Sequence, residues 1–281
     1  MYVFIEINSI KSQDLISCSL IISTYNWPDA LSVCLNSLLN QNVLPGEVII
    51  ADDGSREETR NLISEVQKNF PIELKHIWHV DAGFRLAAIR NKAIAASSAE
   101  YIIQIDGDLI LHPHFVADHL SMQRPGYFVA GSRVMLSKKS TENLLTHKSI
   151  DVKKYSRPRL DMNAIRNSLL RNYLATRYKA KGKHTFYAKG CNMAFFKTDL
   201  IKVNGYNETF TGWGSEDREI TIRLVNAGVK KLFLKNGGIC YHLYHTSPSK
   251  EKEMQNEELM NKAIVSKSIW AEDGLSKYLF S

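Results

Sequence analysis

The sequence predicts an α/β protein with a mixed, mainly parallel sheet flanked by helices. Two observations support this prediction. Short apolar runs alternate with amphipathic stretches over residues 17–134, as in successive βαβ units. The 281-residue chain is also 44% apolar and 23% charged, which permits a packed core and excludes a disordered or collagen-like chain.

The alternation can be followed element by element through the first half of the chain. Each expected strand is a short apolar run, and each expected helix has apolar positions three and four residues apart. The expected strands are 17–23, 47–51, 72–78 and 101–105, and the expected helices are 28–40, 56–69 and 86–96. Because each helix returns the chain to the same end of the sheet, these strands should run parallel.

The regular pattern stops near Val134. Residues 137–184 form a basic insertion or lid with a single expected helix at 163–178. Between Lys138 and Lys183 there are 13 Lys or Arg and only 3 acids. Beyond the insertion, strands are expected at 191–196 and 239–244 and a helix at 216–227, followed by a charged helical tail at 248–281. A positive segment of this kind attracts phosphate groups, on nucleic acid, lipid or substrate.

Several functional classes are excluded by missing patterns. No apolar run reaches the roughly 18 residues that cross a bilayer, and the first residues do not resemble a signal peptide, so we expect a cytoplasmic protein. The first strand is not followed by GxGxxG, which disfavours a dinucleotide-dependent oxidoreductase, and the P-loop pattern is absent. Four widely spaced cysteines indicate neither a zinc knuckle nor a disulfide framework.

Polar residues cluster where the expected strands end. In open α/β sheets, ligands bind outside the carboxyl ends of the strands. The residues at these ends are Thr24-Tyr25-Asn26, Asp52-Asp53-Gly54-Ser55 and Asp106-Gly107-Asp108. Carboxylates gathered at one edge repel one another unless a cation neutralises them, so this edge is expected to bind a divalent metal with a diphosphate.

Two further groups of residues favour chemistry on a sugar. In Gly212-Trp213-Gly214, the glycines let the backbone come close to a flat ligand such as a sugar ring. Glu216 and Asp217 follow at the start of an expected helix. Acids there are also favoured by the helix dipole, so the motif is not decisive by itself. His242 and His245 follow an apolar run, and a nitrogen ligand added to an oxygen-rich site suits Mn²⁺ better than Ca²⁺. Which histidine points inward is open.

The ordered motifs TYN, ADDGS, GFRLAAIRNKAI, DGD and GWGSED, with a late histidine, resemble family 2 glycosyltransferases with the GT-A fold. The second half resembles the carboxy-terminal region shared by β-1,4-galactosyltransferases and chondroitin-type polymerases. The resemblance covers roughly residues 17–245 and leaves the insertion and tail without a counterpart. It implies one domain at 1–247, with a nucleotide-binding half at 1–135 and an acceptor-binding half at 185–247.

The resemblance also implies a role for individual residues. The expected donor-binding residues are Thr24, Tyr25, Asn26 and Asp53 at the nucleoside, Arg90 and Arg85 near the diphosphate, Asp106 at the ribose or sugar, and Trp213 as a wall for the sugar. The expected catalytic residues are Asp217 as base and Glu216 as a ligand of donor or acceptor hydroxyls. The expected metal ligands are Asp108 and His242, with His245 in reserve. Ser215 stands where relatives usually have glycine.

The resulting expectation is an inverting hexosyltransferase that uses Mn²⁺ or Mg²⁺ and a UDP-sugar. The sugar would be of the galactose, N-acetylgalactosamine or glucose type, and the acceptor a glycan or lipid-linked glycan of surface polysaccharide or lipopolysaccharide biosynthesis. Lys153, Lys154, Arg157 and Arg159 beside a possible amphipathic helix suggest docking on an anionic membrane surface, or an acceptor-phosphate site. The alternatives are a metal-dependent nucleotidyltransferase and a nucleic-acid-binding protein. Nucleic acid is not expected, because the basic segment lacks regular aromatic interleaving.

Overall fold

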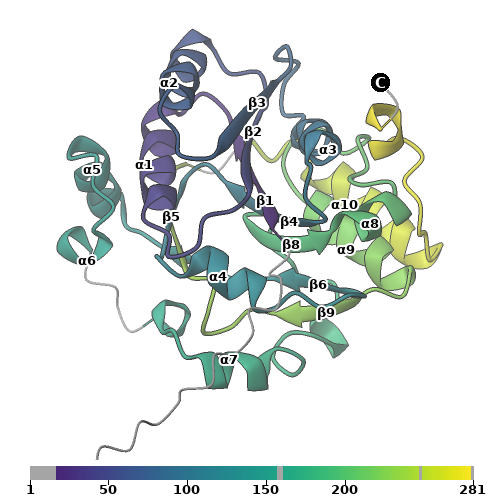
Figure 1. Ribbon diagram of the computed structural model, residues 1–281. Coiled ribbons are helices and arrows are strands. Elements are labelled where there is room, and N and C mark those ends of the chain that lie inside the picture. The colour runs from purple at the N-terminus through teal and green to yellow at the C-terminus, as the bar shows by residue number, and fades with distance from the viewer. Residues whose placement is uncertain (1–16, 157–160, 247–248, 280–281) are drawn as a thin grey trace, which may run out of the picture.

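A computed structural model of the protein describes residues 17–156, 161–246 and 249–279. Within these residues a seven-stranded sheet has the order β3-β2-β1-β4-β8-β6-β9 (Figure 1). Its strands are β1 (Cys18–Thr24), β2 (Glu47–Asp52), β3 (Glu73–Trp78), β4 (Tyr101–Asp106), β6 (Tyr127–Ala130), β8 (Asn192–Phe196) and β9 (Lys230–Phe233). The first four are parallel to one another, whereas β8 is antiparallel to β4 and β6. The predicted α/β class is therefore confirmed.

Helices cover both faces of this sheet because side chains alternate between the faces along each strand. Leu20 and Ile22 of β1 pack toward α1 (Pro28–Leu39) and α2 (Glu57–Gln67), and Ile21 packs on the opposite face. That opposite face is covered by α3 (Leu86–Ala96), α8 (Lys197–Lys202) and α9 (Glu216–Asn226). The expected helices 28–40 and 56–69 end one and two residues earlier than expected, at Leu39 and Gln67.

The strand register gathers the polar strand ends at one edge. In the parallel pairs Ser23 lies opposite Asp106 and Thr24 opposite Asp52. The antiparallel strand β8 begins at the same edge, since Asn192 lies opposite Ile105.

A second, three-stranded sheet extends this edge. It has the order β5-β10-β7, formed by β5 (Leu109–Leu111), β10 (Cys240–His242) and β7 (Val134–Met135). Its register sets His242 opposite Leu109, and the backbone N–H of Leu243 donates to the carbonyl of Asp108 at 3.0 Å. A residue from the end of the chain is thereby brought beside the DGD turn.

The basic insertion differs from the prediction of a single helix. It contains α5 (Lys138–Thr146), α6 (Val152–Tyr155), α7 (Ser168–Leu174) and the 3-10 turns η1 (Met162–Ala164) and η2 (Gly182–His184). The helix expected at 163–178 was too long. Helix α5 was missed because its apolar side is short, and Leu144 is buried in a cluster that α1 and α6 help to form. Arg157 and Arg159 lie outside the described residues.

A buried carboxylate ties the insertion to the domain. Asp118 of α4 (Phe115–Leu120) accepts hydrogen bonds from Arg166 Nε and Nη2 and from Arg171 Nη1, the last at 2.5 Å. Its second oxygen also accepts from the backbone N–H of Gly238 at 3.0 Å. In Figure 1, α7 accordingly lies against the β9 end of the sheet.

The predicted helical tail is helical only in part, in α10 (Glu253–Val265) and the short 3-10 helix η3 (Leu275–Tyr278). It packs onto the domain: Met260 and Ala263 contact the apolar cluster of Phe210 and Ile222, and Leu275 is buried in the core beneath α3. Pro248 and the last two residues lie outside the described part of the chain. Among the described residues, no helix is long and apolar enough to span a membrane.

Candidate active site

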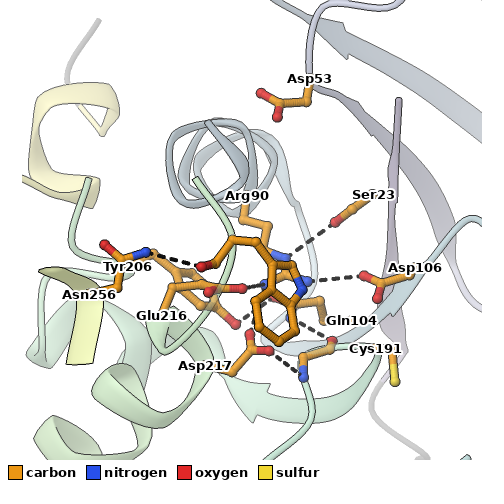
Figure 2. A network of polar contacts seen from close by, with 12 residues as sticks. Ser23, Asp53, Arg90, Gln104, Asp106, Cys191, Tyr206, Glu216, Asp217 and Asn256 are labelled. Carbon is orange, nitrogen blue, oxygen red and sulfur yellow. Dashed lines mark hydrogen bonds and ion pairs between the residues drawn. The ribbon is translucent and has the colours of Figure 1, made fainter. Parts of the chain in front are cut away.

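Arg90 of α3 lies at the centre of the polar edge and is only 1% exposed. Its Nη1 donates to Asp217 Oδ1 at 2.8 Å, its Nη2 to Asp106 Oδ1 at 3.0 Å, and its Nε to Ser23 Oγ at 3.3 Å (Figure 2). The Tyr206 ring lies 5.3 Å from the guanidinium. Each guanidinium nitrogen of Arg90 therefore already has a partner within the protein.

Asp217 is held by both of its oxygens. Oδ1 accepts from Arg90, and Oδ2 accepts from the backbone N–H of Gly190 at 2.7 Å. The loop that carries Gly190 is fixed in turn, because the Gln104 amide donates to the Gly190 carbonyl at 2.9 Å and accepts from the Tyr206 hydroxyl at 3.0 Å. A Cβ on Gly190 would lie 2.1 Å from Asp217 Oδ1, so any other residue here would displace this carboxylate. The carboxylate is thus preorganised, with 22% of its side chain exposed.

Glu216 lies beside Asp217 in a drier environment. Burial, followed by repulsion from Asp217, raises the pKa of Glu216 to about 8, although Arg90 acts in the opposite direction. Its Oε1 lies 3.8 Å from Arg90 Nη1. The raised pKa favours the protonated form of Glu216, which can donate a hydrogen bond to a hydroxyl oxygen, whereas an ionised carboxylate cannot.

Three side chains converge beside this network and could hold a metal. Asp108 Oδ2 lies 3.2 Å from the Nε2 atoms of both His242 and His245, and the three ligand atoms lie within 4.8 Å of one another. The second oxygen, Asp108 Oδ1, is buried without a hydrogen-bond partner among the described residues. Both histidines, and not one alone, therefore face Asp108.

The hydrogen bonds of the two histidines fit metal binding. His242 Nδ1 lies 2.7 Å from the carbonyl of Leu243, and His245 Nδ1 lies 2.8 Å from that of Thr246. A carbonyl only accepts, so Nδ1 carries the proton and Nε2 offers its lone pair to the shared space. Burial lowers the pKa of His242, which favours the neutral imidazole that a metal binds. One carboxylate and two imidazoles suit a divalent transition metal.

Asp53 lies farther along the sheet edge, apart from the Arg90 network in Figure 2, and two donors hold its carboxylate in place. Its side chain accepts from His79 at 2.6 Å and from the backbone N–H of Arg85 at 2.9 Å. Burial raises the pKa of Asp53, while these two donors lower it.

The TYN residues differ in their surroundings. Tyr25 is 49% exposed and donates to Asp81 at 2.9 Å, and Thr24 is buried. Asn26 joins two loops, because its N–H donates to Ser55 Oγ at 2.8 Å and its side-chain oxygen accepts from the N–H of Arg56 at 2.8 Å.

Trp213 lies in the loop that precedes α9. It is 37% exposed, and Lys250 Nζ lies 5.4 Å from its ring.

Comparison with known proteins gives the family of the chain. The model described as "Glycosyl transferase family 2" matches residues 19–203, about two thirds of the sequence. The chain belongs to glycosyltransferase family 2. A second model, described as "N-terminal domain of galactosyltransferase", matches residues 172–246, which contain Glu216, Asp217 and both histidines. The predicted likeness of the second half to galactosyltransferases is confirmed.

Curated relatives of this family 2 enzyme include polysaccharide synthases. Chondroitin synthase of Escherichia coli is 28% identical over 84% of this chain and 35% of the relative. Hyaluronan synthase of Pasteurella multocida is 27% identical over 86% of this chain and 26% of the relative. The chain thus spans about a third or less of these relatives. An E. coli protein named UDP-Glc:alpha-D-GlcNAc-diphosphoundecaprenol beta-1,3-glucosyltransferase WfaP is 23% identical over 94% of this chain and 96% of its own length.

Solved structures confirm the GT-A fold predicted for family 2. Staphylococcus aureus TarS aligns with a TM-score of 0.63 at 14% identity and covers 94% of this chain and 41% of its own. The mannosyltransferase PcManGT of Pyrobaculum calidifontis, solved with GDP-Man and Mn2+, aligns with a TM-score of 0.57 at 16% identity over 82% of this chain and 58% of its own.

Sequence reasoning missed the residues that support the family motifs. Gly190, Gln104 and Tyr206 hold Asp217 and Arg90 in place, but each lies outside any recognisable motif. Ser215, where the resemblance implied a glycine, has a left-handed backbone with φ of 73°. This conformation favours glycine.

Proposed function

We propose that this family 2 enzyme is a metal-dependent inverting hexosyltransferase. It moves a galactose-, N-acetylgalactosamine- or glucose-type sugar from a UDP-sugar to a hydroxyl of a glycan or lipid-linked glycan, in surface polysaccharide or lipopolysaccharide biosynthesis. The observation that carries the proposal is the continuity of the site. Asp217 is linked through Arg90 to Asp106, which lies two residues from the Asp108, His242 and His245 group.

Asp217 is the base in the proposed reaction. It takes the proton of the acceptor hydroxyl as that oxygen attacks the anomeric carbon from the face opposite the leaving UDP. A bond forms between the anomeric carbon and the acceptor oxygen. The bond between the anomeric carbon and the β-phosphate oxygen breaks, UDP leaves, and the acceptor proton stays on Asp217. A single displacement inverts the anomeric carbon and gives a β-glycoside from an α-linked donor. The protonated Glu216 binds a sugar hydroxyl, and Trp213 forms a wall for the ring.

The donor lies along the sheet edge in this proposal. Its nucleoside contacts Thr24, Tyr25, Asn26 and Asp53, Arg90 and Arg85 lie near the diphosphate, and Asp106 faces the ribose or sugar. Asp108, His242 and His245 hold Mn²⁺ or Mg²⁺, which when bound neutralises charge on the diphosphate. A structure of TarS residues 1–349 in complex with UDP, TM-score 0.60, supports a uridine donor by analogy. In this assignment residues 1–135 bind the nucleotide and 185–247 the acceptor.

The function is tested by UDP release from a panel of UDP-sugars with Mn²⁺, with and without EDTA. We expect release from one sugar nucleotide that is abolished by EDTA and by Asp108→Ala. Asp217→Asn should lose transfer but retain UDP binding, which separates an enzyme from a binding module. Formation of UTP and a sugar 1-phosphate when inorganic diphosphate is added, in place of UDP release, would favour the nucleotidyltransferase alternative, and absence of UDP binding would refute a glycosyltransferase that uses UDP-sugars.

We also propose that the basic insertion docks on an anionic membrane surface that carries a lipid-linked acceptor. The residues around α7 expose large apolar side chains within the strongly basic segment. They are Met162 (57% exposed), Ile165 (43%), Leu169 (83%), Leu170 (38%) and Tyr173 (60%). Apolar side chains beside Lys and Arg are typical of helices that lie at the membrane interface. The name of WfaP, which includes a diphosphoundecaprenol-linked sugar, is consistent with such an acceptor.

Flotation with vesicles tests the docking surface. We expect the protein to float with phosphatidylglycerol-rich vesicles and not with phosphatidylcholine vesicles, and Leu169→Ser with Tyr173→Ser to weaken flotation. Val265→Ser on α10, which is 84% exposed in wild type, is the matched control. Equal flotation with both lipids would count against an electrostatic surface and would favour an acceptor-phosphate role for the basic residues.

A further inference from the structure

Arg133 is a partly buried cation that makes little use of its hydrogen-bonding capacity within the described part of the chain. It lies between β6 and β7, where its Nη1 makes a long hydrogen bond of 3.4 Å to Cys191 Sγ. Its Nε is buried and has no hydrogen-bond partner among the described residues. A thiol is a weak acceptor, and a buried guanidinium without strong acceptors costs free energy, so a ligand that supplies acceptors would stabilise it.

The chain on either side of Arg133 runs beside the proposed metal ligands. The carbonyl of Ser132 accepts from Cys240 Sγ at 3.4 Å, and Val134 pairs with Tyr241, so Arg133 lies alongside the strand that ends in His242. Cys191, its partner, precedes β8 at the level of Asp106. Arg133 is therefore located between the Arg90 network and the group of Asp108, His242 and His245.

Electrostatic effects agree with this location. Burial by itself would lower the pKa of Arg133, but Cys191 and the carboxylates of Asp106 and Asp108 raise it. The hydrogen bond to Asp108 raises the pKa of His245, and the positive charge of Arg133 opposes that rise.

The backbone that carries Arg133 is fixed by a buried amide. Asn192 is fully buried, and its Nδ2 donates to the carbonyls of Ser132 at 2.7 Å and Gly238 at 2.9 Å. Its oxygen accepts from His119 Nε2 at 2.8 Å. A Cβ on Gly131 would lie 2.4 Å from this amide, so the turn that leads to Arg133 is closely packed. Such a fixed backbone limits the positions that the guanidinium can reach.

We infer that Arg133 binds the diphosphate of the sugar nucleotide. Arg90, which also lies at this edge, has each guanidinium nitrogen engaged by Asp217, Asp106 or Ser23. Among the described residues, Arg133 Nε has no partner and Nη1 contacts only the Cys191 thiol, so its planar fork can bind phosphate oxygens. The diphosphate is the strongly anionic part of a UDP-sugar, and a metal held by Asp108 would attract it to the same edge of the sheet. The inference rests on the proposed function and adds the residue that binds the leaving group.

Calorimetric binding of uridine, UMP and UDP in the presence of Mn²⁺ tests the inference. We expect Arg133→Ala to weaken UDP binding by about 10- to 100-fold, the range for a lost hydrogen bond to a charged group. The effect on UMP should be smaller, and uridine should bind unchanged. Arg133→Lys keeps the charge without the fork and should fall between wild type and Ala. Arg124→Ala, at the opposite end of β6 and exposed, should bind all three ligands as wild type does.

Separate measurements distinguish a direct contact from an effect through the metal or the fold. Mn²⁺ affinity without nucleotide, measured by electron paramagnetic resonance, should be unchanged or tighter in Arg133→Ala, since a positive charge is removed beside the ion. Equal UDP affinity in wild type and Arg133→Ala, or an equal loss for uridine and UDP, would overturn the inference alone. A parallel loss of Mn²⁺ affinity would overturn it too. Failure of wild type to bind UDP would overturn the proposed function and the inference with it.

Discussion

Gly190→Ala is expected to slow the enzyme strongly while leaving most of the molecule unchanged. The new Cβ would lie 2.1 Å from Asp217 Oδ1 and 2.3 Å from Oδ2, whereas Cβ atoms essentially never approach other atoms within 3.0 Å. The carboxylate must therefore move by about 1 Å, and a displacement of that size at a reacting group costs about 10²-fold in rate. Gly190 does not have a positive φ, so alanine brings no backbone strain of its own.

The assay is steady-state UDP release with the donor and acceptor identified by the panel experiment. We expect kcat to fall about 100-fold and the Kd for UDP to stay within about twofold, because the base contacts the acceptor rather than the nucleotide. Gly228→Ala is the matched control: it has open space around it and a φ of 88°, and it lies beyond the far end of α9. It should lose about 1 kcal/mol of stability and keep kcat. Retention of kcat in a folded Gly190→Ala protein would refute the assignment of Asp217 as base.

The remaining predictions concern pH, metal and the insertion. Because the folded-state pKa of Glu216, about 8, exceeds its ordinary value of 4.5, the folded protein holds a proton that the unfolded chain loses in this window. Glu216 therefore lowers the free energy of unfolding as pH rises from about 4.5 to 8, and urea denaturation of Glu216→Gln should show a flatter pH dependence. Saturating Mn²⁺ should raise Tm by several degrees in wild type and not in His242→Ala, since a ligand of the folded state alone stabilises it. Asp118→Ala should cost about 3–5 kcal/mol in urea denaturation, because it leaves Arg166 and the buried Arg171 without their carboxylate.

Each of these predictions has an outcome that contradicts it. An unchanged pH slope in Glu216→Gln would mean that Glu216 is ionised in the folded protein. An equal Tm shift in wild type and His242→Ala would locate the metal elsewhere. A loss below 1 kcal/mol in Asp118→Ala would show that the insertion is held by its apolar contacts instead.

The sequence by itself determined the alternation of strands and helices in the first half and the acids that follow the strands. These features are local, because a strand or helix that buries one face repeats its apolar residues with a fixed period. The ordered motifs likewise identified the family, since they depend on residue types and not on contacts. The missed helix α5 shows the limit of this periodic signal. Its apolar side is short, and Leu144 is buried only in the folded molecule, in a cluster that includes residues of α1.

Only the tertiary structure decided how the site is assembled. Arg90 and Asp217 are 127 residues apart in the chain, and Asn192 and Ser132, which fix the turn before Arg133, are 60 apart. The convergence of both histidines on Asp108 depends on the pairing of β10 with β5. Such contacts leave no periodic trace in the sequence, because each partner sits in a different element and is selected by shape and charge in the folded molecule. Arg133 therefore gains its expected role only when the strands that surround it are assembled.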